Sequence, residues 1–311
     1  QPYSRDRRER LSLPRKHISG KSTQVANGYS ATGGCTHSFD LPVVHIVGTN
    51  GKGSTATFLD FLAREHGLKT GLFTSPHLVC VRERIKINGQ LISTDKWLEL
   101  ANIVYMKCSH LNLTYFEFLT LMAALAFESE KVDLAIFEAG LGGTYDATNV
   151  FESMLTVFTS IDQDHIHVLG QSLEEIARDK AGSIKKAPVV SSIQKPEVLE
   201  VIKQRIKQKK VPFYYMPCFF EHGKKITFNK SPCLQFGPED LSLKGEFQKI
   251  NAGTAILAWW VLCQKNNWPF NDKKIKKALK KAFLPGRMQL VHKNPEVLLD
   301  AAHNPAALIA L

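Results

Sequence analysis

From Leu41 onward, short apolar runs rich in β-branched residues alternate with longer segments of helical periodicity. Such alternation is typical of βα units, which assemble into a mainly parallel sheet flanked by helices. Ligands of such α/β folds lie at the carboxyl ends of the strands, so functional motifs are expected there. The expected strands are residues 41–47, 69–75, 132–140, 154–161 and 187–192, and the expected helices are 54–67, 116–129 and 173–184.

The first expected strand leads directly into the glycine-rich stretch GTNGKGST, residues 48–55. A glycine loop between a strand and a helix presents free backbone N–H groups and the positive helix end to a phosphate. The strict P-loop pattern is not met, because Ile46 replaces its first glycine and Gly53 separates Lys52 from Ser54. A tight turn with incidental glycines is the alternative, but the polar residues favour nucleotide binding. The candidate residues are Thr49, Asn50, Gly51, Lys52, Gly53 and Ser54.

Composition and charge restrict the class of protein. No run approaches the ~18 apolar residues of a membrane-spanning helix, so no membrane partner is expected. The six cysteines are scattered without CxxC pairs or zinc-like spacing, which favours reduced thiols and a cytoplasmic protein. The net charge of +11 concentrates in residues 4–10, 203–210 and 273–281. Such runs are typical of solvated faces, and a basic protein attracts anionic small substrates.

Five segments occur in the order and spacing of one enzyme family. They are VGTNGKGST (47–55), GLFTSPHLVCVRERIKING (71–89), FEAGLGGTYDATNV (137–150), DHIHVLGQSLEEIARDKAG (164–182), and PGRMQLV with VLLDAAHNP (285–305). Together they resemble the folylpolyglutamate synthase and dihydrofolate synthase family of the Mur ligase superfamily, over residues 41–311. The resemblance implies an α/β central domain, with a P-loop-type mostly parallel sheet flanked by helices, at 41–285. Residues 286–311 would begin a second α/β domain.

The implied activity is an ATP-dependent amide ligase that adds L-glutamate to a folate, to dihydropteroate, or to both. Joining a carboxylate to an amine needs a better leaving group than oxide, so ATP would convert the carboxylate into an acyl phosphate. The amine then displaces phosphate. The choice of acceptor depends on pocket shape and stays open. We expect these small molecules as the only partners of a monomeric chain, with no nucleic acid.

The resemblance also implies a metal site. Matching side chains in the family hold two magnesium ions between ATP and the incoming carboxylate, and oxygen ligands with one imidazole suit Mg²⁺. From residue types alone, Glu138 is equally a strand-end carboxylate paired with a lysine, and His165 a capping or core histidine. Lys180 matches a lysine that is carbamylated in the family, although sequence alone suggests a solvated helix lysine. The metal ligands implied are Ser54, Ser75, Glu138 and His165.

Other implied contacts involve the nucleotide. Asn251 matches a residue that contacts the base, although an ordinary helix N-terminus is the alternative. Arg287 and Asp300 match residues that reach ATP from the start of the C-terminal domain, with His303 beside them. A guanidinium delivered by a closing domain can stabilise phosphoryl charge. The expected catalytic residues are Lys52, His165, Lys180 and Arg287.

The family match also places a pterin site. Aromatic side chains there can stack on a flat ring, although Tyr115 and Phe116 can equally belong to the core. The implied residues are Pro76, His77, Thr114, Tyr115, Phe116 and Glu117.

Three departures from the family pattern matter. Thr144 and Tyr145 follow GLGG where many members have arginine, and Asp162 replaces a common glycine. The sequence ends at Leu311, shortly after AHNP. We therefore expect residues 295–302 to form a lone strand and the last ~25 residues to be mobile, because an unpaired edge is left exposed. Such a chain would bind MgATP but ligate glutamate poorly.

The lead-in and the alternative functions complete these expectations. Residues 1–40 are expected to be poorly ordered, and their Arg and Ser content leaves organelle targeting as an alternative. A Mur-type ligase of a cell-wall precursor is disfavoured, because those loops generally carry GKT or GKS. A P-loop ATPase or kinase would release phosphate without depending on glutamate. A non-catalytic nucleic-acid binder lacks the clustered aromatic and basic residues it would need.

Overall fold

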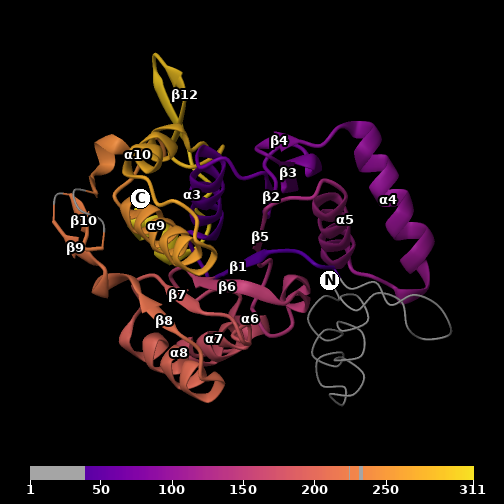
Figure 1. Cartoon of the computed structure of the whole chain (residues 1–311), viewed down its shortest axis with the longest axis horizontal. Helices are drawn as coiled ribbons and strands as arrows, with labels where there is room; N and C mark the ends of the chain where they lie inside the picture. Colours follow the sequence, from indigo (N-terminus) through magenta and orange to yellow (C-terminus); the bar gives the residue numbers. More distant parts are fainter. Residues whose placement is uncertain (1–38, 224, 231–233) are drawn as a thin grey trace.

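The computed structural model describes residues 39–223, 225–230 and 234–311, and its centre is an eight-stranded sheet (Figure 1). The strand order is β4-β3-β2-β5-β1-β6-β7-β8. Neighbouring strands from β2 to β8 pair in parallel, whereas β3 and β4 add an antiparallel edge. The strands are β1 (Val43–Val47), β2 (Thr70–Phe73), β3 (Ile85–Ile87), β4 (Gln90–Leu91), β5 (Leu134–Glu138), β6 (Ser153–Phe158), β7 (Val189–Ser191) and β8 (Phe213–Tyr215).

Helices cover both faces of this sheet. Val44 and Ile46 face a core that includes α3, α9 and α10, whereas Val43 and Val47 face α5 and α7 on the opposite side. Every residue of β1 and β5 is buried, which explains their almost continuous apolar character. The helices are α3 (Lys52–Glu65), α4 (Thr94–Cys108), α5 (Tyr115–Ser129), α6 (Ile166–Leu169), α7 (Leu173–Ala181), α8 (Pro196–Lys209), α9 (Phe247–Asn266), α10 (Asp272–Lys281) and α11 (Pro305–Ala310).

Two smaller sheets follow the central one. The first is antiparallel, with β9 (Phe220–His222), β10 (Ile226–Phe228) and β11 (Gln235–Phe236). The second is the hairpin of β12 (Gln289–Lys293) and β13 (Glu296–Leu299), which projects from the body of the molecule (Figure 1). Short 3₁₀ helices lie at Val81–Arg84, Ser109–Leu111, Ala147–Val150, Met216–Cys218 and Pro238–Asp240.

The expectation of a lone strand at 295–302 is wrong. Residues 296–299 pair antiparallel with 289–293, and Asn294 and Pro295 form the turn between them. The sequence interpretation missed the turn and hence the first strand of the hairpin. The division of the chain at residue 285 stays a prediction, and the expected lead-in lies almost wholly outside the described residues. No helix among the described residues is long and apolar enough to cross a membrane.

Candidate active site

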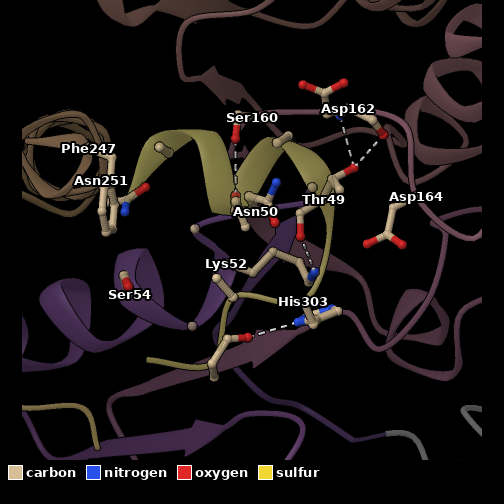
Figure 2. A pocket seen from close by; sticks show the side chains of 18 of the residues that line it. Thr49, Asn50, Lys52, Ser54, Ser160, Asp162, Asp164, Phe247, Asn251 and His303 are labelled. Atoms are coloured by element: carbon tan, nitrogen blue, oxygen red, sulfur yellow. Dashed lines mark hydrogen bonds between the residues drawn. The ribbon is translucent and has the colours of Figure 1, made fainter. Parts of the chain in front are cut away.

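A pocket of about 500 Å³ lies at the carboxyl ends of the central strands. The start of α3, the loops after β5 and β6, the start of α9 and the segment 286–311 surround it. Figure 2 shows the side chains from α3, the loop after β6, α9 and His303. Most of the predicted site residues meet here although they are far apart in sequence. Those that line the pocket are Thr49, Asn50, Gly51, Lys52, Gly53, Ser54, Ser75, Pro76, Glu138, His165, Lys180, Asn251, Arg287, Asp300 and His303.

The glycine loop connects β1 to α3 as expected. Gly51 precedes the helix with φ 81°, a left-handed conformation that glycine adopts without strain. The backbone N–H groups of Thr49 and Asn50 donate to the Ser160 carbonyl at 2.8 and 3.2 Å, which fixes the loop against the segment after β6. The N–H groups of the first turn of α3 have no intrahelical partner by geometry. The start of α3 therefore presents N–H donors of the kind that bind anions at helix N-termini.

Lys52 lies over this loop. Its Nζ donates to the Thr49 carbonyl at 3.0 Å, so the ammonium is folded back beside the loop that it would serve (Figure 2). The positive charge thus lies at the position where a bound polyphosphate would meet the loop.

Glu138 ends β5 and is only 3% exposed. Its Oε2 accepts the Ser75 N–H at 3.1 Å. Burial raises the pKa of this carboxyl, while the charges of Lys52 and Arg287 and the Ser75 N–H oppose the shift. A Cβ at Gly53 would lie 3.5 Å from Oε2, so the carboxylate packs directly against the first turn of α3.

Lys180 is 4% exposed, so the solvated alternative is wrong. Its Nζ donates to the Gly48 carbonyl at 2.9 Å. Burial, and then the nearby charge of Lys52, lower its pKa to about 7, against the opposing effect of Asp179. A substantial fraction of this amine is therefore neutral near neutral pH.

His165 precedes α6 in a left-handed conformation with φ 49°. Its backbone N–H donates to Asp164 Oδ1 at 2.8 Å, and its side chain is 52% exposed. The core alternative is therefore wrong, and the side chain makes no helix-capping hydrogen bond. Asp164 also lines the pocket, and the sequence interpretation assigned it no role.

The segment 286–311 supplies the remaining wall. Asp300 accepts the N–H groups of Met288 and Ala302, each at 2.8 Å, and thereby closes the base of the hairpin. Asn304 forms a reciprocal amide pair with Asn50, with N–O distances of 3.0 and 3.3 Å. Its Nδ2 also donates to Asp164 Oδ2 at 3.1 Å. This contact joins the C-terminal segment to the glycine loop, and sequence reasoning missed it.

The expected pterin residues other than Pro76 lie outside the pocket. Thr114 and Glu117 form the capping box of α5, so both have a structural role. Phe116 packs 5.5 Å from Phe73 against the core, whereas Tyr115 is exposed. The Arg84 guanidinium lies 5.6 Å from the Tyr115 ring, and its Nε donates to His77 at 2.9 Å, so the structure brings these three side chains together.

Thr144 and Asp162, two positions at which the sequence departs from the family pattern, have different surroundings. Thr144 donates its hydroxyl to the Asp179 carbonyl at 2.7 Å and packs against α7. Asp162 lines the pocket, but its Oδ1 pairs with Lys195 Nζ at 2.9 Å. Its backbone N–H and carbonyl both bond to the Thr49 hydroxyl, at 3.1 and 3.0 Å.

The side chains expected to bind Mg²⁺ suit this ion only together with the phosphates of a bound substrate. Among the described residues, no three of the types His, Cys, Asp and Glu gather as a metal cluster. Ser54, Ser75 and Glu138 offer oxygen donors at the loop, and the buried carboxylate lies beside the first turn of α3. Mg²⁺ is typically held by one or two carboxylates together with substrate phosphates. The donor set matches that pattern, and the number of ions stays a prediction.

A strand, a glycine loop and a helix start, facing a lysine and a buried carboxylate, are the arrangement typical of P-loop-type α/β proteins. The chain belongs to the Mur ligase middle domain family, whose family model matches residues 46–259.

The relatives carry specific names. The dihydrofolate synthase/folylpolyglutamate synthase of Bacillus subtilis (strain 168) is 40% identical over 280 residues, which cover 84% of this chain and 64% of that protein. The mitochondrial folylpolyglutamate synthase of Bos taurus is 35% identical over 306 residues, covering 87% of this chain and 50% of that protein. This chain thus spans between half and two thirds of these curated relatives.

Solved structures agree in fold. A complex of folylpolyglutamate synthase with AMPPCP and folate superposes with a TM-score of 0.80 at 27% identity, covering 96% of this chain and 76% of that one. Folylpolyglutamate synthase of Mycobacterium tuberculosis, complexed with ADP and AMPPCP, gives 0.78 at 29% identity, over 88% of this chain and 65% of the other. The predicted α/β class and Mur ligase fold are confirmed.

Proposed function

We propose that this chain is the nucleotide-binding part of an ATP-dependent ligase that adds L-glutamate to a folate, to dihydropteroate, or to both. The observation that carries the proposal is the convergence of Lys52, Glu138 and Arg287 on the pocket at the start of α3. The names of the relatives supply the substrate class. The Mur-type and ATPase alternatives have no comparable support.

The proposed chemistry begins with ATP in this pocket. The start of α3 and Lys52 would bind the phosphates, and Arg287 would add charge as the phosphoryl group moves to the acceptor carboxylate. The amine of glutamate then attacks the acyl phosphate, phosphate leaves with the C–O bond electrons, and the amine proton is lost. Asn251 and Phe247, which line the same pocket from the start of α9, would contact the base.

Mg²⁺, when bound, would neutralise phosphate charge. Ser54, Ser75, Glu138 and His165 are the residues that we propose would hold it, in up to two sites. Glu138 requires ionisation for this role, and the cationic neighbours that oppose its raised pKa favour the ionised form.

We also propose that Lys180 is carbamylated in the active protein. The neutral amine attacks carbon dioxide, forms an N–C bond and releases one proton, which leaves a carbamate anion. Its pKa of about 7 supports the reaction, because only the neutral amine is nucleophilic. The resulting anion would lie beside Gly48 and Lys52. Mass spectrometry of the intact native chain would register the added carbon dioxide.

Folate or dihydropteroate would approach from the side of Pro76. The group formed by His77, Arg84 and Tyr115 supplies an aromatic face and a guanidinium for a flat, anionic acceptor. Replacing Tyr115 by alanine should raise the KM for the acceptor without changing MgATP affinity.

The partner and compartment proposals are simpler. Four cysteines among the described residues, Cys80, Cys108, Cys218 and Cys263, are reduced, which suits a reducing compartment such as the cytoplasm. We propose a monomer, which size-exclusion chromatography with light scattering would test.

The decisive assay measures incorporation of radiolabelled glutamate with ATP and each acceptor in turn. Product that requires ATP and one acceptor supports the ligase and identifies its substrate. A rate of ATP hydrolysis that does not depend on either acceptor or on glutamate would instead support the ATPase alternative. MgATP affinity, measured by calorimetry, tests the nucleotide site of this chain separately from ligation.

A further inference from the structure

Gln248 is a buried polar residue behind the pocket wall. It is the second residue of α9 and is 0% exposed. Its Nε2 donates to Ser54 Oγ at 3.2 Å, and its Oε1 accepts from Asn251 Nδ2 at 2.9 Å. One carboxamide thus joins a candidate phosphate or metal ligand on α3 to the candidate base-contacting residue on α9. These two neighbours line the pocket.

The polarity of the amide fixes the orientation of both neighbours. Because Ser54 Oγ accepts from Gln248, the serine hydrogen points elsewhere and a lone pair of the oxygen stays available for a ligand. Because Asn251 donates one hydrogen to Gln248, its second N–H hydrogen remains for the pocket. A Cβ at Gly51 would lie 2.3 Å from Asn251 Oδ1, so the oxygen end of Asn251 lies against the glycine loop.

Because Gln248 is buried, its hydrogen-bond partners cannot be exchanged for water. Water cannot replace a lost partner at a fully buried amide. Reorienting any one of the three hydrogen-bonded side chains therefore leaves an unsatisfied polar group.

We propose that Gln248 is a positioning residue that couples the phosphate end of the nucleotide pocket to its base end. This inference rests on the proposed nucleotide function, with Ser54 at the phosphates and Asn251 at the base. Through Gln248, recognition of the correct base fixes the Ser54 oxygen for Mg²⁺ and phosphate, so the two ends bind cooperatively.

A purely structural role is the competing explanation, because α3 and α9 pack closely together. Loss of packing would weaken binding of all nucleotides equally. Loss of coupling would change two ratios, which are the discrimination between ATP and GTP and the Mg²⁺ dependence of ATP binding. The experiment therefore measures these ratios.

The test variants are Gln248→Met, which keeps the volume without polar groups, and Gln248→Glu, which keeps the acceptor for Asn251 but removes the donor to Ser54. Thr254→Val is the matched control. Thr254 is also 0% exposed on α9, but within the part of the chain that the structure describes its hydroxyl bonds only to the Ile250 carbonyl of its own helix, at 2.8 Å. Circular dichroism and urea unfolding verify the fold of each variant.

For Gln248→Met we expect the Mg²⁺ concentration needed for half-maximal ATP binding to rise about tenfold, as for other residues that orient metal ligands. The ATP-to-GTP affinity ratio should fall toward one. Gln248→Glu should raise the Mg²⁺ requirement and retain base discrimination, and Thr254→Val should change neither. In a double-mutant cycle, the Mg²⁺ effects of Ser54→Ala and Gln248→Met should be less than additive, because Gln248 acts on Mg²⁺ binding through the Ser54 oxygen.

The outcomes separate this inference from the proposed function. A wild-type chain without MgATP affinity would overturn both. If the wild-type chain binds MgATP and prefers it to GTP, but Gln248→Met weakens both nucleotides equally with unchanged Mg²⁺ dependence, only the coupling is overturned. If Gln248→Met does not fold, Gln248→Glu decides, because an unchanged Mg²⁺ requirement in that variant contradicts the proposal.

Discussion

The two walls of the pocket differ sharply in burial. The sheet wall consists of the glycine loop with Ser54, Glu138 and Lys180, and these three side chains are 3–4% exposed. The C-terminal wall consists of residues 286–311. Between 287 and 311, where the structure describes every residue, only Asn304 is buried. The sheet wall is thus preorganised by the core, whereas the C-terminal wall lines the pocket with residues that are, apart from Asn304, not buried.

This difference assigns separate tasks to the two walls. Groups that must meet phosphate in a fixed geometry are best carried by packed strands and helix starts, where reorganisation is small. Arg287, which we propose adds charge as the phosphoryl group moves, lies on a segment with limited packing, which suits a group delivered by closure. Substitutions in the sheet wall should therefore change intrinsic affinity, and those in the C-terminal wall should change how that segment associates with the loop.

The largest expected effect is at Lys52. Lys52→Ala removes the charge beside the start of α3, which should weaken MgATP binding by about 3 kcal/mol or more than a hundredfold. Isothermal titration calorimetry measures the change. Lys69→Ala is the control, because Lys69 forms a half-exposed pair with Glu130 outside the pocket. Equal affinities of Lys52→Ala and wild type would remove the loop lysine from nucleotide binding.

Substitution of Lys180 tests whether burying its amine in the sheet wall lowers the free energy of unfolding. The unfolded chain keeps the lysine proton up to about pH 10.5, whereas the folded chain releases it above about pH 7. The unfolded state binds more protons in this interval, so the Lys180 contribution to the free energy of unfolding rises with pH.

Lys180→Met removes this dependence. Its stability relative to wild type should therefore be greater at pH 6 than at pH 9, by about 2 to 3 kcal/mol. Urea unfolding in buffers depleted of carbon dioxide measures the difference. A pH-independent difference would mean that the folded protein keeps the lysine charged.

Asn304 tests the C-terminal wall. Asn304→Ala removes the amide pair with Asn50, the bond to Asp164 and the N-cap bond to the Ala307 N–H of α11, which together should cost about 1 to 2 kcal/mol. Hydrogen exchange should accelerate in residues 300–311 while the sheet strands keep their protection. Asn294→Ala, in the exposed hairpin turn, is the control. Unchanged exchange near Asn304 would show that this contact does not hold the segment.

The sequence predicted the framework of the sheet wall well because its signals are local. Apolar runs, a glycine loop and helical periodicity gave the central strands and α3, α5 and α7. The edge strands β3, β4 and β8 are too short for periodicity. The charged residues 203–210 and 273–281 were interpreted only as solvated runs, although they fall mostly within α8 and α10.

Site residues that lie in family motifs were predicted, whereas residue pairs that depend only on tertiary contacts were missed. Gln248 and Ser54 are 194 positions apart, and Asn304 and Asn50 are 254 apart. No local pattern specifies such pairs, because each depends on the packing of complete helices. Thr114 and Glu117 show the opposite case. The family motif predicted a ligand site there, but the two residues cap the N-terminus of α5.

The smallest expected effect is at Asp162, where the sheet wall departs from the family glycine. Its carboxylate pairs with Lys195, whose side chain is 52% exposed, and such pairs typically contribute below about 1 kcal/mol. The contact with Thr49 uses the Asp162 backbone, which Asp162→Asn retains. This variant should therefore change MgATP affinity less than about threefold, whereas Thr49→Val should weaken it more because the hydroxyl bonds are lost. Calorimetry on both variants at two Mg²⁺ concentrations distinguishes the alternatives. A large, Mg²⁺-dependent loss in Asp162→Asn would show that this carboxylate is a working part of the metal site and that the pair with Lys195 breaks when the nucleotide binds.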